Sequence, residues 1–269
     1  MLYRIAEPSA ENLDQQWRIL NPEENCFRAV SFIDGLAALS HRHGRIPSQA
    51  PAAPSGSLAA PFGGTKILCV GRNYRPHVRE LGNEIPKEPL WFSKPPSSLI
   101  GHNGKVLLPK GFGRIDYEGE VAFVIGRSGR NISASEALKF IAGVTLAIDI
   151  TARELQKTDG QWTRAKGFDT FCPLGPGIAS FEQSWLDCSI TTTKNGTIVQ
   201  NDRLSSLIFP VPQLIQHLSA CMTLEPGDVI LTGTPAGVGP LESGDHLKVE
   251  AEGPVHLSLN VTVEAAVFE

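Results

Sequence analysis

Short apolar runs bounded by turns dominate the chain after about residue 66. Runs at 67–70, 120–125 and 143–149 are typical of buried strands, because each is too short for a buried helix. In the C-terminal third, two Gly-Asp turns each precede a further apolar run, and the alternating stretch 256–267 predicts one more strand.

Helical patterns are few. Pro76 suits the first position of a helical turn over 76–81, and a longer helix is expected from Ala152 to about Lys157. Ser133-Ala-Ser-Glu136 has the pattern of a capping box and predicts another helix start. Because strands outnumber helices and do not alternate regularly with them, we expect an α+β fold rather than a doubly wound parallel sheet.

The N-terminal part has a different character. Residues 1–44 contain short apolar runs, such as 26–32, that predict small strands, and 46–57 is a Pro/Ala/Ser-rich stretch typical of a linker. We therefore divide the chain into a small β-rich appendage with its linker, 1–62, and a larger catalytic domain, 63–269.

Acidic residues stand where strands usually exclude them. Glu118 and Glu120 immediately precede the run 121–125, and side chains at i and i+2 of a strand point to the same face. Asp149 follows a second buried run and is expected at a strand end. Three converging carboxylates form a hard-oxygen site of the kind that binds Mg²⁺, with Mn²⁺ or Ca²⁺ able to take its place.

Composition narrows the class of protein. The 269 residues, 41% of them hydrophobic, are enough for a substantial core, and a net charge of -4 without a Lys/Arg run argues against a nucleic-acid partner. No apolar run is long enough to span a bilayer, so no membrane association is expected. The odd count of 5 cysteines, without metal-ligand spacing, indicates reduced thiols in a cytoplasmic protein.

Six segments in order resemble the fumarylacetoacetate hydrolase family. They are VGRNYRPHVRE (70–80), WFSKP (91–95), DYEGEVAFVIG (116–126), DITARELQ (149–156), DGQWTRAKGFDTFCPLGP (159–176) and LTGTPAGVG (231–239). The resemblance covers roughly 66–269 and implies a mixed β-roll of layered sheets with few helices. It also implies a homodimer that binds a divalent metal, and it places Glu118, Glu120 and Asp149 on the metal-ligand positions.

The resemblance assigns roles to other residues as well. Lys166 would lie beside the metal-bound substrate, where an ammonium stabilises developing negative charge. Arg153 and Gln156, spaced i, i+3 on one helix face, and Thr234 in the glycine-rich segment would contact the substrate. A plain surface helix and a plain turn are the competing interpretations of these two segments.

His77 and Glu80 are also spaced i, i+3. The pattern alone carries little information, but in the family this segment is a lid whose His–Glu dyad is a candidate general base for water. An ordinary solvent-facing helix is the alternative interpretation.

Together these features predict a divalent-metal-dependent enzyme that cleaves a C–C bond in a small 2-oxo or 2,4-dioxo acid. Hydrolysis of an acylpyruvate and decarboxylation of an oxaloacetate-like acid both fit. The alternatives are isomerisation of an unsaturated 2-hydroxy or 2-oxo dioic acid of aromatic catabolism and, remotely, a non-catalytic binding protein. The expected partner is a small dicarboxylate or 2-oxo acid.

Overall fold

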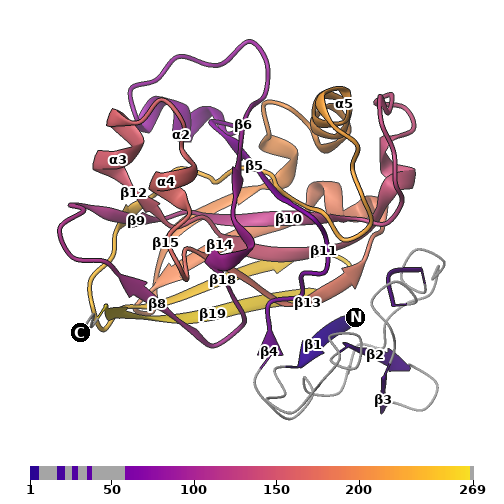
Figure 1. The fold of residues 1–269 in the computed structure, drawn as a ribbon, viewed down its shortest axis with the longest axis horizontal. Coiled ribbons are helices and arrows are strands. Elements are labelled where there is room, and N and C mark those ends of the chain that lie inside the picture. The colour runs from indigo at the N-terminus through magenta and orange to yellow at the C-terminus, as the bar shows by residue number, and fades with distance from the viewer. Residues whose placement is uncertain (6–16, 22–25, 30–34, 38–57, 267–269) are drawn as a thin grey trace.

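The computed structural model describes residues 1–5, 17–21, 26–29, 35–37 and 58–266. Layered sheets with a few short helices at one edge form the body of the protein (Figure 1). This is the α+β arrangement that the strand-rich pattern predicts, so the fold expectation is confirmed. The expected linker 46–57 lies outside the described residues, and the division of the chain at 62/63 stays a prediction.

The largest sheet has 11 strands. Its order is β3 (Cys26–Ala29), β2 (Trp17–Asn21), β1 (Leu2–Ile5), β13 (Cys172–Ser180), β11 (Ile141–Ile148), β10 (Gly119–Ile125), β16 (Val229–Leu231), β5 (Ile67–Gly71) and β6 (Leu90–Lys94). Strand β4 (Leu58–Ala59) pairs with β1, and β7 (Leu99–Ile100) pairs with β13.

A second sheet has 5 strands, and its strands β18 and β19 are drawn beneath β10 and β11 in Figure 1. Its order is β15 (Thr197–Arg203), β14 (Ser189–Lys194), β18 (His246–Glu252), β19 (His256–Ala265) and β8 (Gly104–Leu108). A small third sheet contains β12 (Thr151–Ala152), β9 (Ile115–Tyr117) and β17 (Gly239–Pro240).

The α-helices are α2 (Arg75–Glu80), α3 (Arg153–Thr158), α4 (Thr163–Lys166) and α5 (Val211–Cys221). Single 3-10 turns are η2 (Pro96–Ser98), η3 (Ala137–Phe140), η4 (Gln183–Asp187) and η5 (Leu204–Ser206). Helices α2, α3 and α4 gather above the edge of the sheets, on the upper left of Figure 1.

Strand β10 is buried on both faces and therefore reads as a continuous apolar run. Val121 and Phe123 belong to the apolar cluster that also contains Val249 and Leu259 of the second sheet. The alternate side chains, including Val124, belong to a second cluster on the opposite face. The strand predicted over 120–125 is thus confirmed, and it lies at the centre of the fold.

The predicted capping box at Ser133–Glu136 is wrong. The chain forms only the 3-10 turn η3, whose N-cap residue is Glu136 and has no side-chain cap hydrogen bond. The two serine hydroxyl groups lie 3.0 Å from each other instead. Serine side chains also bond locally in turns, so the same pattern fits a turn without an α-helix.

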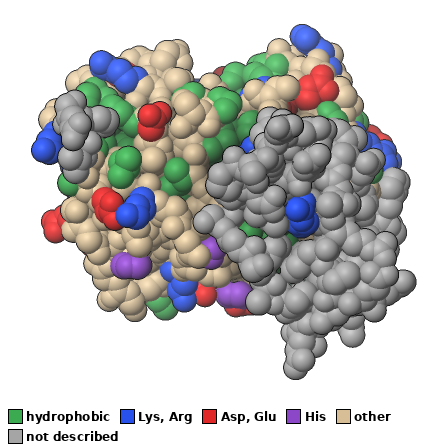
Figure 2. Space-filling model, turned by 60° about the horizontal axis from the view of Figure 1, so that its bottom comes forward, with side chains coloured by type: hydrophobic (Ala, Val, Ile, Leu, Met, Phe, Trp, Pro, Cys, Tyr) green, Lys and Arg blue, Asp and Glu red, His purple; other side chains and the backbone are tan. Residues whose placement is uncertain are grey.

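The molecular surface carries mixed charge where Figure 2 colours it. Basic side chains on that face are scattered among acidic ones and form no continuous stripe over the coloured residues. In the described part of the chain, no helix is long and apolar enough to cross a membrane.

Replacing Phe123 should reveal how much the inter-sheet core contributes. Its ring is fully buried and lies 6.1 Å from the ring of Phe181 in an edge-to-face contact. We expect Phe123→Ala to lower the free energy of unfolding by about 3–5 kcal/mol in urea titrations. Ile198→Ala, at a side chain that is 62% exposed, should change it by less than about 0.5 kcal/mol. Equal effects would contradict this description of the core.

Candidate active site

Strand register places the acidic side chains together. Strands β10 and β11 are antiparallel, with Gly119 opposite Ile148 and Glu120 opposite Ala147. The same register continues one step further, where the Asp149 N–H donates to the Glu118 carbonyl oxygen at 2.8 Å. Glu118 stands at the junction of β9 and β10 rather than inside one strand, because the chain passes there from the small sheet to the large one.

Carboxylate oxygens of Glu118, Glu120 and Asp149 all lie within 4.8 Å of one another. The three residues are 5%, 1% and 1% exposed, so water provides almost no screening of their charges. The structure therefore brings together all three acidic residues on which the sequence prediction of a metal site depends.

Two buried lysines face this acidic cluster. The Lys166 ammonium on α4 lies 2.8 Å from Glu118 Oε2 and 2.5 Å from Asp149 Oδ2. The Lys94 ammonium, at the end of β6, lies 2.8 Å from Asp149 Oδ1 and donates to backbone carbonyl groups of Lys166 and Phe171. Lys94 thus links the acidic cluster to the backbone that presents Lys166.

Burial and neighbouring charges shift the pKa values of the two glutamates in opposite directions. Burial alone would raise the pKa of Glu118, but Lys166 and Arg153 hold it well below its usual value. Burial, reinforced by Asp149 and Glu118, raises the pKa of Glu120 well above its usual range. Burial lowers the pKa of Lys166, but its two carboxylate neighbours outweigh that effect and raise it, so the ammonium stays charged.

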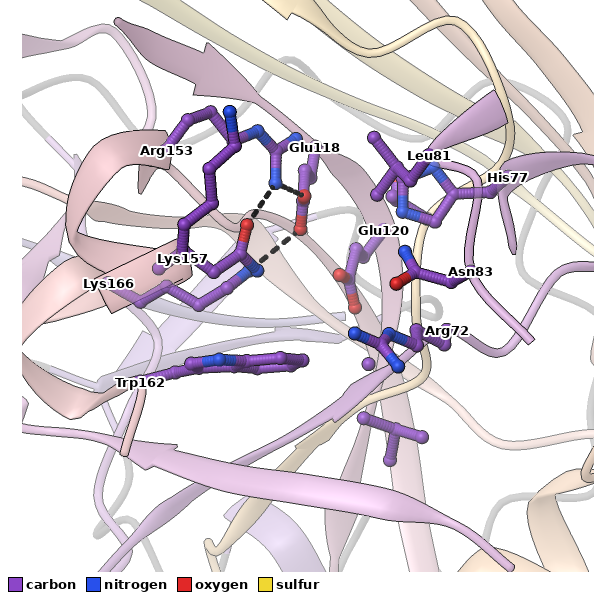
Figure 3. Close-up of a pocket in the computed structure, with 14 residues that line it drawn as sticks. Arg72, His77, Leu81, Asn83, Glu118, Glu120, Arg153, Lys157, Trp162 and Lys166 are labelled. Atoms are coloured by element: carbon purple, nitrogen blue, oxygen red, sulfur yellow. Dashed lines mark hydrogen bonds and ion pairs between the residues drawn. The ribbon is translucent and has the colours of Figure 1, made fainter. Parts of the chain in front are cut away.

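Arg153 opens helix α3 and points back toward the strands. Its Nη1 lies 2.7 Å from Glu118 Oε1 and donates to Gln156 Oε1 at 2.8 Å, while its Nε donates to Asp116 at 2.7 Å (Figure 3). Arg153 and Gln156 therefore share one helix face, as their spacing indicates. Arg153 Nη2 is buried and has no hydrogen-bond partner among the described residues.

His77 and Glu80 lie on helix α2, and their side chains meet at 3.3 Å between Nδ1 and Oε2. His77 is 3% exposed and lines the cavity, whereas Arg75 and Arg79 on the same helix are exposed. The Gly237 N–H donates to Glu80 at 3.0 Å, so the carboxylate is held from a second direction. The structure brings the expected pair together.

The glycine-rich segment after β16 supports Glu120. The Gly233 N–H donates to Glu120 Oε2 at 2.7 Å, and Gly233 has a φ of 100° that disfavours a side chain. Thr234 lines the cavity, and its hydroxyl group donates to the Gly119 carbonyl and accepts from Gln200. The backbone of this segment therefore binds a carboxylate, and that carboxylate belongs to Glu120 of the protein itself.

These side chains line a cavity of about 280 Å³. It contains the expected residues Glu118, Glu120, His77, Arg153, Gln156, Lys166 and Thr234. This volume is close to the lower end of ligand pockets in proteins and suits a small molecule. Asp149 lies behind this lining and Glu80 beside it, each in contact with a residue of the wall.

Sequence reasoning missed several residues around the cavity. Lys94 is buried and donates to backbone carbonyl groups, and Asp116 forms an ion pair with Arg153. Both residues lie within the segments that carry the family resemblance. The signal in the sequence was their position, because each is a charged residue at the end of an apolar strand or just before one. Arg72 and Trp162 also line the cavity, and no spacing rule connects residues so far apart in sequence.

The donor set suits a hard divalent cation. Three carboxylates are the ligand type that Mg²⁺ and Mn²⁺ prefer. Glu120 has no ion pair among the described residues, and burial, reinforced by Asp149 and Glu118, raises its pKa, so a bound cation would stabilise its charged form.

Comparison with known proteins identifies the family. The family model described as fumarylacetoacetate (FAA) hydrolase C-terminal matches residues 66–262. A curated relative, the mitochondrial oxaloacetate decarboxylase of Dictyostelium discoideum, is 44% identical over 200 residues, which cover 71% of this chain and 90% of that protein. The chain belongs to the fumarylacetoacetate hydrolase family of enzymes, and the expected resemblance is confirmed.

Two solved structures add detail. A 5-carboxymethyl-2-hydroxymuconate delta-isomerase from Mycobacterium smegmatis is 43% identical, with a TM-score of 0.72 over 78% of this chain and 80% of that one. A fumarylpyruvate hydrolase from Pseudomonas aeruginosa, in complex with Mn²⁺ and pyruvate, is 29% identical, with a TM-score of 0.70 over 81% of this chain and 99% of that one. The metal in that relative agrees with divalent-metal use here.

Removing the Lys94 charge should destabilise the protein. Lys94→Met keeps the length of the side chain but removes the buried ammonium group that pairs with Asp149. We expect the free energy of unfolding, measured in urea with EDTA present, to fall by about 3–5 kcal/mol. Lys105→Met, which breaks an exposed ion pair with Glu264, should cost less than about 1 kcal/mol. A similar small effect at Lys94 would show that it does not balance the cluster.

Proposed function

We propose that this protein is a divalent-metal-dependent enzyme that cleaves a C–C bond in a small 2-oxo or 2,4-dioxo acid, as an acylpyruvate hydrolase or an oxaloacetate-type decarboxylase. The observation that carries the proposal is the group of three buried carboxylates beside the Lys166 ammonium, two of which line a cavity sized for a small acid. Mg²⁺ is the metal we propose for it, and a cytoplasmic homodimer remains part of the expectation.

Glu118, Glu120 and Asp149 would hold the cation. When bound there, a divalent cation supplies a Lewis acid that polarises the keto oxygen of a 2-oxo acid. The protein groups around it define where substrate oxygens fit. Arg153 Nη2, buried and without a partner among the described residues, is a ready donor to a substrate carboxylate.

Lys166 provides fixed positive charge close to the proposed reaction centre. Its ammonium is held between Glu118 and Asp149 and lies 4.8 Å from the centre of the Phe92 ring, so its position is defined on several sides. A charge oriented before the reaction stabilises negative charge that develops on the substrate without a cost of reorganisation. Gln156 and Thr234 add hydrogen-bonding groups to the cavity wall.

For hydrolysis, His77 would accept the proton of the attacking water. Its Nδ1 contacts Glu80, which orients the ring and stabilises the charged form, and the ring itself lines the cavity. Decarboxylation needs no attacking water, so His77 has a smaller part in it. The decarboxylase relative favours that reaction, and the water-activating dyad favours hydrolysis.

Isomerisation of an unsaturated dioic acid is the second candidate. The named isomerase among the solved structures favours it, and the His77–Glu80 pair is able to move a proton without bond cleavage. A panel of acetylpyruvate, fumarylpyruvate, oxaloacetate and hydroxyheptadienedioate with Mg²⁺ separates the candidates. Absence of turnover on all of them would contradict the proposed function.

Glu118→Ala should abolish both metal binding and turnover, because it removes one of the three proposed ligands. Isothermal titration with Mn²⁺ measures the first, and an assay with and without EDTA measures the second. Glu264→Ala, at an exposed glutamate, is the matched control and should behave as wild type. A Glu118→Ala enzyme that binds metal and turns over substrate would refute the ligand assignment.

His77→Ala should distinguish the two cleavage reactions. We expect roughly a hundredfold or greater loss of kcat for acylpyruvate hydrolysis, the usual contribution of a general base. Oxaloacetate decarboxylation should fall much less, since no water is activated. The two rates are measured on the same metal-loaded preparation, and an equal loss in both would remove the proposed role of His77.

A further inference from the structure

Two cations in the cavity, Arg72 and Lys157, have no part in the chemistry described so far, and Arg72 is the more buried of them. Arg72 follows β5, is half-buried and lines the same cavity as the acidic cluster. Arg153 and Lys166 are each paired with two carboxylates. Arg72 has no carboxylate partner among the described residues, and its recorded contact is with the Trp162 ring.

The geometry of that contact leaves the hydrogen-bonding groups of Arg72 available. The guanidinium carbon lies 5.8 Å from the centre of the Trp162 ring, within the range of a cation–π interaction. A contact of this kind uses none of the guanidinium N–H donors. Those donors form the fork that binds a carboxylate with two parallel hydrogen bonds.

The backbone holds Arg72 in this position. Arg72 has a φ of 56°, in the left-handed region that non-glycine residues seldom adopt. The next residue, Asn73, is fully buried and is tied by its side chain to Thr232 and Phe209, which fixes the turn. On the other side, a Cβ at Gly71 would lie 2.7 Å from the Trp162 ring, so only glycine lets the indole approach.

Arg72 and Lys166 both lie near the Trp162 ring. The Lys166 ammonium is 6.0 Å from the Trp162 ring centre, a distance similar to that of Arg72. Figure 3 shows Arg72 on a different side of the cavity from Arg153, with Glu120 drawn between them and Trp162 below Lys166. An acid bound beside Arg153 at one end would therefore have Arg72 near its other end.

We infer that Arg72, beside Trp162, binds the distal carboxylate of the substrate and so selects 2-oxo dioic acids over 2-oxo monocarboxylic acids. This inference rests on the proposed function, because it takes the 2-oxo carboxylate end to lie at the acidic cluster. Lys157, the other cavity cation without a recorded ion pair among the described residues, is exposed and is therefore the weaker candidate.

Binding of unreactive ligands tests the assignment without relying on turnover. 2-Oxoglutarate and 2-oxopentanoate have the same chain length and differ in the distal carboxylate. Isothermal titration of the Mn²⁺-loaded wild-type protein should show tighter binding of 2-oxoglutarate. Arg72→Gln should weaken 2-oxoglutarate binding roughly tenfold to a hundredfold and leave 2-oxopentanoate within about twofold, since only the charge-assisted bonds are lost.

Three further proteins complete the experiment. Arg72→Lys should retain part of the preference, because it keeps the charge but not the fork. Arg130→Gln removes the same charge from an exposed site outside the cavity and should bind both ligands as wild type does. Lys157→Gln should leave the preference intact. Thermal melts and Mn²⁺ affinity, measured for every variant, identify damage to the fold or to the acidic cluster.

Several results would contradict the assignment of Arg72. Equal weakening of both ligands by Arg72→Gln, a loss of Mn²⁺ affinity without a loss of preference, or a preference that depends on Lys157 would each overturn the assignment. A wild-type protein that does not distinguish the two ligands would overturn it as well, even if the enzyme turns over acylpyruvates. A clear Arg72-dependent preference in a protein that cleaves no 2-oxo acid would leave this inference standing and remove the proposed reaction.

Discussion

The structure depends on balancing negative charge that has been removed from water. Glu118, Glu120 and Asp149 are nearly inaccessible to solvent, and three acidic groups within a few ångströms of one another repel strongly at low dielectric. Lys166 and Lys94 supply opposite charge from α4 and from the end of β6. The short helices and the strand ends around the cavity are therefore placed by electrostatics as much as by apolar packing. A bound cation would complete this balance.

The acidic residues and the other polar residues of the site lie on different kinds of element. The acidic residues stand on or beside two central strands whose backbone is fixed by neighbours on both sides. His77 and Arg153 stand on helices of one or two turns at the sheet edge. Glu80 joins α2 to the segment after β16 through the Gly237 N–H, so the two sides of the cavity mouth are connected. Under the proposed function, metal ligands on fixed strands and substrate contacts on short helices would suit an enzyme that admits and releases a small acid.

Short continuous apolar runs were enough to predict the central strands, and strand alternation was enough to predict the shared face of Glu118 and Glu120, because both are properties of a single strand. Family resemblance then indicated His77, Lys166 and Arg153, which the structure gathers in one cavity. Lys94, Asp116 and Arg72 escaped prediction because their roles arise from contacts between segments far apart in the chain. The Ser133–Glu136 pattern failed for the opposite reason, since a local signal fits a turn as well as a helix.

The pairing of β10 with β11 has a consequence for how such a protein can diversify. Glu120 faces Ala147, and Glu118 lies beside Asp149, because the register of the two strands is unbroken from Gly119 to Val124 and shifts only between Val124 and Ile125, away from the acidic residues. Deleting or inserting a single residue between Gly119 and Ile148 within either strand would turn alternate side chains to the other face and scatter the acids. Changes of length are harmless to the acids only in the loops. New substrates in this lineage should therefore arise through the cavity rim, while the two strands stay constant in length.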